Sequence, residues 1–267
     1  MTGKNRAGSM EWIRMRLEAV PGNISCICKN LASGETFRYR PDAPHEAASI
    51  IKLYLMAAVF QGFEDGEFRP EDRLPVRRED CVPSCGVLTY LDDGKEVSLR
   101  DLTELMIIVS DNTACNVLAD FYTLERAQDF IRNRLGRKDT FFRRKMFDAE
   151  SRRKGIENIT TAADTAWLLE EIRSGRLVSP EASEAMLNML RHQRLNGKLP
   201  FRLHTLENAP VIAHKTGENE RTTHDAGIIE TREPLLVCMM GNETDVPAFE
   251  RVMADVAWDL AVTTGRI

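Results

Sequence analysis

Apolar residues recur along this chain with two different periods, which separate helices from strands. Apolar positions spaced three and four residues apart predict helices over residues 11–20, 47–63, 98–122, 124–135, 161–174, 180–193 and 248–263. Short apolar runs bounded by turn residues predict strands at residues 24–31, 36–40, 211–215, 225–230 and 235–240. The segment 47–63 is apolar on every side, which predicts a helix in the interior.

The order of these elements predicts the fold class. Strands cluster near both ends of the chain and helices occupy the middle. This order is typical of a mixed α/β (α+β) protein in which both ends build one antiparallel sheet flanked by helices. We expect a single domain, residues 1–267, in which about residues 10–46 and 195–267 form an α/β subdomain. Residues of about 47–194 would form an all-helical or mainly helical subdomain.

Composition narrows the range of partners. Of the 267 residues, 43% are hydrophobic and 29% are charged, and the net charge is -5. These values fit an ordinary globular protein and give no reason to expect nucleic acid or an anionic membrane as a partner. No run approaches the roughly 18 apolar residues that span a bilayer, and residues 1–9 do not resemble a secretory leader. We expect a soluble monomer that acts on a small molecule, either cytoplasmic or trimmed of a leader.

The six cysteines do not indicate a disulfide framework, because the chain is long enough to bury a core without one. Most are expected to be small buried residues. Cys81 and Cys85 lie in a turn-rich string, where they either close a small loop or remain two exposed thiols. Too few ligands surround them for a metal site, and we expect neither a metal nor another cofactor.

Three short strings carry the candidate chemistry: Ser49-x-x-Lys52, Ser110-Asp111-Asn112 and Lys215-Thr216-Gly217. A Ser-x-x-Lys string is expected by chance roughly once in a chain of this length, and Ser151-x-x-Lys154 is a second copy. That copy lies in a cluster of cations without an apolar helix behind it, which indicates a solvated segment. The other two strings are each expected well under about 0.1 times per such chain, so the ordered trio is informative.

The first string can supply an activated nucleophile. A serine hydroxyl needs a nearby base to react at neutral pH, and the helical repeat places Lys52 one turn after Ser49 on the same face. A lysine accepts a proton only in its neutral form, which burial favours. The alternative is an N-cap serine followed by a lysine that extends to solvent.

The second string offers polar groups inside an apolar helical run. Ser110 can pass a proton to a leaving nitrogen, and Asn112 can bind a carbonyl group or hold a lysine in place. Asp111 is better suited to brace the turn. The alternative for all three residues is a helix-capping turn without chemistry.

The third string fits an edge strand that lines a cleft. Lys215 supplies positive charge, Thr216 can bind a carboxylate, and Gly217 lets a ligand approach the backbone. The backbone N–H of Glu218 would form an oxyanion hole together with that of Ser49. The alternative is an ordinary turn at the end of a strand.

Together the three strings resemble those of the class A β-lactamase branch of the penicillin-recognising serine hydrolases. The resemblance covers nearly the whole chain and implies an α/β sheet flanked by helices with an all-helical subdomain. It implies that Ser49 is acylated with Lys52 as the nearby base. The other residues bordering the cleft would be Ser110, Asn112, Lys215 and Thr216, of which the last two would face the substrate carboxylate.

One feature of that family is missing. Class A enzymes use a glutamate, in a Glu-x-x-Leu-Asn string, to activate the water that hydrolyses the acyl-enzyme. The corresponding loop here, residues 143–150, lacks the string, and an ungapped register places Lys145 where the glutamate belongs. Asp148, Glu150 or Glu157 would have to replace it, the alternative being that these are solvated loop carboxylates. Acylation of Ser49 is therefore expected, whereas fast turnover requires a base that the sequence does not identify.

Three functions remain open at this point. The first is a serine β-lactamase that hydrolyses the β-lactam amide through acyl-Ser49. The second is a related peptidase or esterase, for example for D-Ala-D-Ala peptides, or a penicillin-acylated protein that releases its adduct slowly. The third is a ligand-binding sensor. Glu218 and Glu220 favour a neutral or cationic substrate, unless Arg221 restores anion binding or pairs with them.

Overall fold

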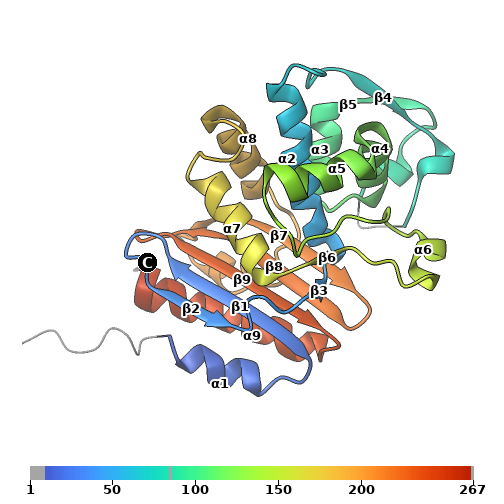
Figure 1. Ribbon diagram of the computed structural model, residues 1–267. Coiled ribbons are helices and arrows are strands. Elements are labelled where there is room, and N and C mark those ends of the chain that lie inside the picture. Colours follow the sequence, from blue (N-terminus) through green and yellow to red (C-terminus); the bar gives the residue numbers. More distant parts are fainter. Residues whose placement is uncertain (1–9, 84–85, 266–267) are drawn as a thin grey trace, which may run out of the picture.

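The computed structural model describes residues 10–83 and 86–265, and its centre is an antiparallel five-stranded sheet (Figure 1). The strand order is β2-β1-β9-β8-β7. These strands are β1 (Asn23–Asn30), β2 (Thr36–Tyr39), β7 (Val211–Asn219), β8 (Thr222–Glu230) and β9 (Leu235–Asn242). Two come from one end of the chain and three from the other, which confirms the predicted sheet.

Helices cover both faces of the sheet, because neighbouring side chains of a strand point to opposite faces. In β9, Val237 and Met239 pack in one core with α1 (Trp12–Glu18) and α9 (Val246–Leu260). Cys238 and Met240 pack in the second core, on the face that α7 (Ala162–Arg173) covers (Figure 1). The sheet is thus packed by a helix from the middle of the chain as well as by the terminal helices that the sequence predicts.

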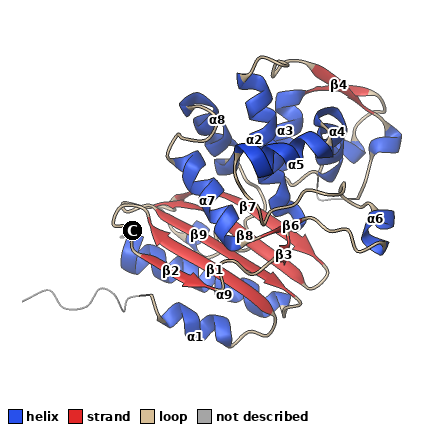
Figure 2. Ribbon diagram, viewed as in Figure 1, coloured by secondary structure: helices blue, strands red, loops and turns tan. Residues whose placement is uncertain are grey.

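The helical part is built around α2 (Ile51–Glu64), which has other helices about it (Figure 2). Residues 51–62 of α2 are all buried. This burial agrees with the prediction of an interior helix. Around α2 lie α3 (Leu99–Ile108), α4 (Asn112–Tyr122), α5 (Leu124–Asp129) and α8 (Pro180–Arg191). Helices α5 and α9 each continue into a short π-helical turn. The predicted helix at 98–122 is broken at Ser110 and Asp111, where polar residues interrupt the apolar pattern.

Two short strand pairs and one short helix are not predicted by the hydrophobic pattern. Strand β3 (His45–Glu46) pairs with β6 (Ile159–Thr160), and β4 (Arg73–Val76) pairs with β5 (Lys95–Ser98). Helix α6 (Ala149–Arg153) lies in the segment before β6. These elements of two to five residues are too short to show a clear period, so only the structure reveals them.

Strands β7 and β8 are longer than the apolar pattern predicts. Strand β7 continues past Lys215 to Asn219, and β8 begins at Thr222 instead of residue 225. The additional positions include several polar residues, so the apolar run stops before the strand does. The third string therefore lies inside an edge strand and not at its end.

The cysteines are buried where the structure describes them, with one exception. Four are buried free thiols: Cys26, Cys28, Cys115 and Cys238. Cys81 is a partly buried free thiol, whereas Cys85 and the question of a closed loop lie outside the described residues. Among residues 10–83 and 86–265, no helix combines the length and the apolar character needed to cross a membrane.

Candidate active site

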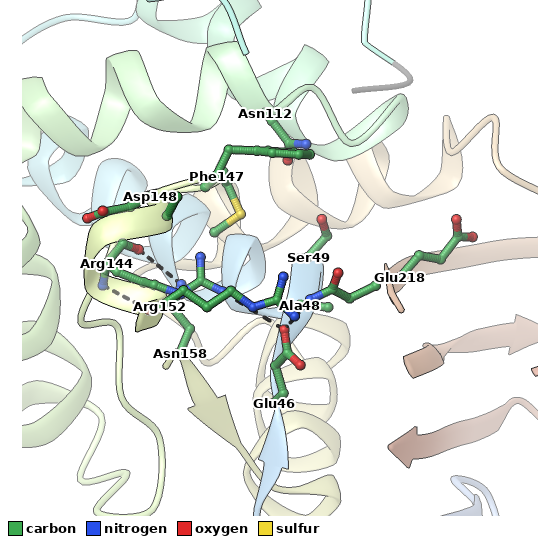
Figure 3. A pocket seen from close by; sticks show the side chains of 13 residues that line it. Glu46, Ala48, Ser49, Asn112, Arg144, Phe147, Asp148, Arg152, Asn158 and Glu218 are labelled. Atoms are coloured by element: carbon green, nitrogen blue, oxygen red, sulfur yellow. Dashed lines mark hydrogen bonds and ion pairs between the residues drawn. The ribbon is translucent and has the colours of Figure 1, made fainter. Parts of the chain in front are cut away.

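Ser49 lies in a 3₁₀ turn, Ala48–Ile50, that leads directly into α2. The residue before it, Ala48, has a φ of 44°, a left-handed conformation that costs an alanine about 1–3 kcal/mol. Such strain persists only where the surrounding structure imposes it. Ser49 lines a cavity of about 180 Å³, which also touches Asn112, Glu218 and the loop before α6 (Figure 3).

The side chain of Lys52 is completely buried and reaches the second string. Its Nζ lies 2.7 Å from the carbonyl oxygen of Ser110, 2.6 Å from Asn112 Oδ1 and 3.2 Å from Ser110 Oγ. The two carbonyl oxygens only accept hydrogen bonds, so Lys52 donates to both. Asn112 therefore holds the lysine in place, close enough to the Ser110 hydroxyl for the two groups to exchange a proton.

The hydroxyl of Ser110 lies between two buried lysines. Lys215 Nζ is 3.0 Å from Ser110 Oγ and also donates to the Thr216 carbonyl at 2.8 Å. When Lys215 donates to the hydroxyl oxygen, the Ser110 proton is left to face Lys52 or a bound ligand. The geometry thus permits Ser110 to donate a proton. Its φ of 54° is a second left-handed backbone in the site.

Asp111 braces the turn and takes no part in this cluster of lysines. Its Oδ2 accepts from the backbone N–H groups of Val87 and Leu88, at 2.8 and 3.0 Å. Its Oδ1 accepts from the N–H of Ala114 at 3.0 Å and caps α4. The carboxylate thereby fixes Ser110 and Asn112 on either side of it.

Strand β7 approaches the serine turn closely at Gly217. A Cβ at this position would lie 3.1 Å from Ile50 Cγ1 and 3.0 Å from His224 Cδ2. The next residue of β7, Glu218, lines the same cavity as Ser49. The two predicted oxyanion donors thus belong to residues of one cavity. Thr216 is buried beside them, with 2% of its surface exposed.

The loop that replaces the missing glutamate string is held at two asparagines. Asn158 Oδ1 accepts from the N–H groups of Arg143 and Arg144, and its Nδ2 donates to the Arg144 carbonyl. Asn116 of α4 binds the loop in the same way, because it accepts from the Met146 N–H at 2.8 Å and donates to the Met146 carbonyl at 3.0 Å.

These contacts determine which loop side chains meet the cavity. Met146 and Phe147 line it, and Phe147 is 59% exposed with a φ of 59°. Lys145, which the ungapped register places at the glutamate position, instead pairs with Asp120 at 2.9 Å. The loop therefore presents apolar side chains to the cavity at this point.

Asp148 is the one candidate base that lines the cavity. It caps α6, accepting from the Ser151 N–H at 3.0 Å and from Ser151 Oγ at 2.7 Å. These hydrogen bonds lower the pKa of Asp148, which makes it a weaker base. The second Ser-x-x-Lys string thus serves α6, since Ser151 holds Asp148 and Lys154 pairs with Glu150 at 2.6 Å.

The other two candidate bases do not line the cavity. Glu150 is mostly exposed in its pair with Lys154, and Glu157 pairs with Arg144 at 2.6 Å. Arg221 pairs with Glu243 at 2.8 Å and not with the glutamates of its own turn.

Two further carboxylates line the cavity, and each has a partner. Glu46 accepts from Asn219 Nδ2 at 2.5 Å. Glu218 pairs with Lys198 at 3.0 Å. Among the described residues, no three His, Cys, Asp or Glu side chains gather in a way that would hold a metal ion.

Buried His224 joins β8 to the segment that precedes Ser49. Its Nε2–H donates to the Glu46 carbonyl at 2.7 Å, and its Nδ1 accepts from the Gly241 N–H at 3.1 Å. Burial, with a smaller contribution from nearby His45, lowers the pKa of His224 to about 3. The ring is therefore neutral throughout the physiological range.

Sequence reasoning does not single out Asn116, Met146, Phe147 or His224. Asn116 and Met146 are 30 residues apart, and His224 and Glu46 are 178 apart. No local pattern encodes such contacts. The available signal is Asn116 itself, a polar residue among the apolar positions of a buried helix.

Comparison with known proteins agrees with this fold. The model of the beta-lactamase enzyme family matches residues 10–261. A beta-lactamase of Rhodobacter capsulatus is 27% identical over 238 residues, which are 85% of this chain and 78% of that protein. The crystal structure of a beta-lactamase from Sphaerobacter thermophilus has a TM-score of 0.86 at 32% identity and covers 99% of both chains.

A third similar structure is a PBP-A mutant in an acyl-enzyme complex with penicillin G. It has a TM-score of 0.83 at 25% identity and covers 100% of both chains. The fold and the comparisons define a hydrolase with a β-lactamase or transpeptidase-like architecture. The chain belongs to the beta-lactamase enzyme family.

Proposed function

We propose that this protein is a serine hydrolase of the class A β-lactamase type, which opens the β-lactam amide through an acyl-Ser49 intermediate and releases the product slowly. The observation that carries the proposal is the position of Ser110. Its hydroxyl lies between Lys215 and Lys52, and Lys52 belongs to α2, the helix that follows the Ser49 turn. This arrangement supplies a nucleophile, a base and a proton donor within one cluster.

In the acylation step, Ser49 Oγ attacks the carbonyl carbon of the β-lactam while its proton passes to Lys52. The N–H groups of Ser49 and Glu218 stabilise the oxyanion that forms. When the C–N bond breaks, the nitrogen takes the hydroxyl proton of Ser110, and Lys52 returns a proton to Ser110. The products are one serine ester and one secondary amine, which stays attached through the opened ring.

The remaining site residues orient the substrate. Lys215 and Thr216 supply the positive charge and the hydroxyl for its carboxylate. Asn112 holds Lys52, and Gly217 keeps β7 close to the serine turn. The protein requires no cofactor for this chemistry, because every proton transfer uses a side chain of the cluster.

Slow release is supported by the side chains that line the cavity. Its three carboxylates, at Glu46, Asp148 and Glu218, each have a hydrogen-bond or ion-pair partner. Met146 and Phe147 occupy the loop between Arg144 and Asp148. A water molecule near acyl-Ser49 therefore lacks a strong base, and Asp148 is the loop carboxylate that lines the cavity.

Intact-mass analysis after brief exposure to benzylpenicillin tests the acyl-enzyme. We expect a mass increase of one whole penicillin, because the leaving nitrogen is part of the opened ring. Ser49→Ala is expected to abolish the adduct, whereas Ser174→Ala, on the exposed end of α7, retains it. An unmodified wild-type protein that also fails to hydrolyse nitrocefin would refute the proposal.

Met146→Glu tests whether a missing base limits release. The new carboxylate would enter the cavity from a backbone that Asn116 already holds, and general-base catalysis contributes roughly 10²–10⁴-fold. We expect decay of the penicillin adduct to accelerate by at least about tenfold, within that range. Met146→Gln is the matched control without the charge. Rapid adduct loss in the wild type would show that another group already serves as the base.

The same cavity favours a second candidate function, hydrolysis of D-Ala-D-Ala peptides. When a peptide acylates Ser49, its terminal D-Ala departs as a free amine. The amine of an opened β-lactam instead stays attached to the acyl group and remains in the site. Release of D-Ala from such a peptide, with benzylpenicillin acting as an inhibitor, would favour this function. Absence of D-Ala release together with nitrocefin turnover would favour the first.

A further inference from the structure

Lys198 is a buried cation that no motif and none of the steps above employs. Its side chain is 4% exposed and lies in the loop between α8 and β7. Its Nζ lies 3.0 Å from Glu218 Oε1 and 3.7 Å from Glu250 Oε1. A buried cation is costly unless it is paired, and these two carboxylates offset that cost for Lys198.

The same ammonium group also binds two backbone carbonyls on adjacent strands. Lys198 Nζ is 3.2 Å from the Gly217 oxygen and 3.2 Å from the His224 oxygen. Gly217 and His224 are direct partners in the pairing of β7 with β8. Lys198 therefore fixes the two strands together at the point where β7 approaches the serine turn.

The Gly217 carbonyl belongs to the same peptide unit as the N–H of Glu218. A peptide unit is planar and trans, so its C=O and N–H point in opposite directions. A charged donor that holds the oxygen on one side therefore sets the direction of the N–H on the other. It also polarises the peptide, which makes the N–H a stronger donor.

This peptide needs such a hold because one of its two residues is glycine. Glycine has the widest range of backbone conformations, and a Cβ at Gly217 would crowd Ile50 and His224. A side chain that would normally restrict the backbone is thus disfavoured here. A hydrogen bond from outside the strand replaces it.

We propose that Lys198 is a positioning residue for the oxyanion hole, which holds the Gly217–Glu218 peptide so that the Glu218 N–H faces the acylation site. The inference rests on the proposed acylation of Ser49. A direct role in binding the substrate carboxylate is disfavoured, because Lys198 does not line the cavity and already binds Glu218 and Glu250.

Acylation kinetics of Lys198→Met test the proposal. Loss of a whole oxyanion-hole donor costs about 10²–10³-fold, and we expect about a tenfold loss of the acylation rate constant for a misdirected donor. The dissociation constant of the preceding complex should change by less than about twofold, because only the transition state uses this contact fully. Lys198→Arg should restore most of the rate. Lys95→Met, at an exposed position of β5, is the control.

Benzylpenicillin and its methyl ester separate the two possible roles of Lys198. The proposal predicts the same fold-loss in acylation for both compounds. A loss confined to the free acid, or a weakened initial complex, would assign Lys198 to carboxylate binding instead. Equal rates in wild type and Lys198→Met would overturn the inference while leaving acyl-Ser49 intact, whereas absent wild-type acylation would refute the proposed function itself.

Infrared spectroscopy of the acyl-enzyme measures the ester carbonyl directly. Its stretching frequency would stay unchanged if Lys198 only stabilised the fold. Hydrogen bonds from an oxyanion hole lower the stretching frequency of the ester carbonyl. We expect this band to shift to higher frequency in Lys198→Met and to return in Lys198→Arg. If Lys198→Met does not fold, Lys198→Gln keeps a neutral donor and should show an intermediate shift. An unchanged band in a folded variant would contradict the proposal.

Discussion

At the scale of single residues, Ser110 is the group whose surroundings are most specific. Two lysine Nζ atoms lie 3.2 and 3.0 Å from its Oγ, and its carbonyl oxygen accepts from Lys52 at 2.7 Å. Its left-handed backbone is held by Asp111, which binds three backbone N–H groups. The serine is thus fixed by groups on both sides, which suits directed proton transfer.

Removing the Ser110 hydroxyl should slow acylation while leaving Ser49 as a nucleophile. We expect Ser110→Ala to lower the acylation rate constant by about 10²–10⁴-fold, the usual contribution of a positioned acid. Stopped-flow nitrocefin measurements check this value. Ser110→Gly is the matched variant, because glycine adopts the left-handed backbone without strain. If glycine restored the rate, backbone strain and not the hydroxyl would explain the loss.

At the scale of elements, the site depends on how closely β7 packs against the serine turn. Gly217 permits this packing, and the longer β7 carries Glu218 and Asn219 to the cavity. The helix α2 behind Ser49 is buried throughout its first twelve residues. It cannot move aside to accommodate a bulkier residue on β7 without disturbing the core.

Gly217→Ala should therefore displace β7 from Ser49. Its Cβ would meet Ile50 and His224 at 3.1 and 3.0 Å, and overpacking of this kind costs about 1–3 kcal/mol. A misplacement near 1 Å lowers rates by about 10²-fold, so we expect acylation to fall by at least tenfold. Urea unfolding and acylation kinetics measure the two effects. Gly197→Ala, where a Cβ meets nothing within 4 Å, should change neither.

At the scale of the whole molecule, His224 connects the sheet to the serine segment. It links β8, the Glu46 carbonyl of β3 and the Gly241 N–H of β9. Both ring nitrogens are used in the neutral form, since Nδ1 accepts while Nε2–H donates. Protonation would place a proton on Nδ1, where it would face the Gly241 N–H. This clash disfavours the charged ring in the same direction as its burial, which lowers the pKa of His224 to about 3.

The stability of the fold should consequently fall in mild acid. The pKa of His224 is about 6.5 in the unfolded state and about 3 in the folded state. At a pH between these values, His224 binds a proton in the unfolded state and not in the folded state. The free energy of unfolding then decreases as the pH falls through this window, by up to about 1.4 kcal/mol per pH unit.

Urea unfolding at pH 7, 6, 5 and 4.5 measures this slope. His224→Gln should be less stable at pH 7 and should show a smaller slope, because its side chain does not titrate. Substitution of exposed His192 by Gln is the matched control and should retain the wild-type slope. Identical slopes in all three proteins would show that other groups cause the acid sensitivity.

The fold was predictable from the sequence where one element is long and one period dominates. The five sheet strands and buried α2 each follow from apolar positions within a short window, whereas the break at Ser110 was not predicted, because the apolar pattern resumes after it. The ends of β7 and β8 were not predictable, because polar residues that border the site interrupt the apolar run. Short elements such as β3, β6 and α6 also lack a measurable period.

The sequence by itself determined the three motif strings, the sheet built from both ends and the buried helix behind Ser49, because each depends on local spacing and hydrophobicity. Only the tertiary structure decided three contacts of the site. Asn116 binds the backbone of Met146, which lines the cavity, Ser151 donates a hydrogen bond to Asp148, and Lys198 donates one to the Gly217 carbonyl. Asn116 lies 30 residues from Met146, and Lys198 comes from a loop that meets β7 only after the chain has folded. Contacts of this kind depend on the three-dimensional direction of side chains, which no pattern along the chain encodes.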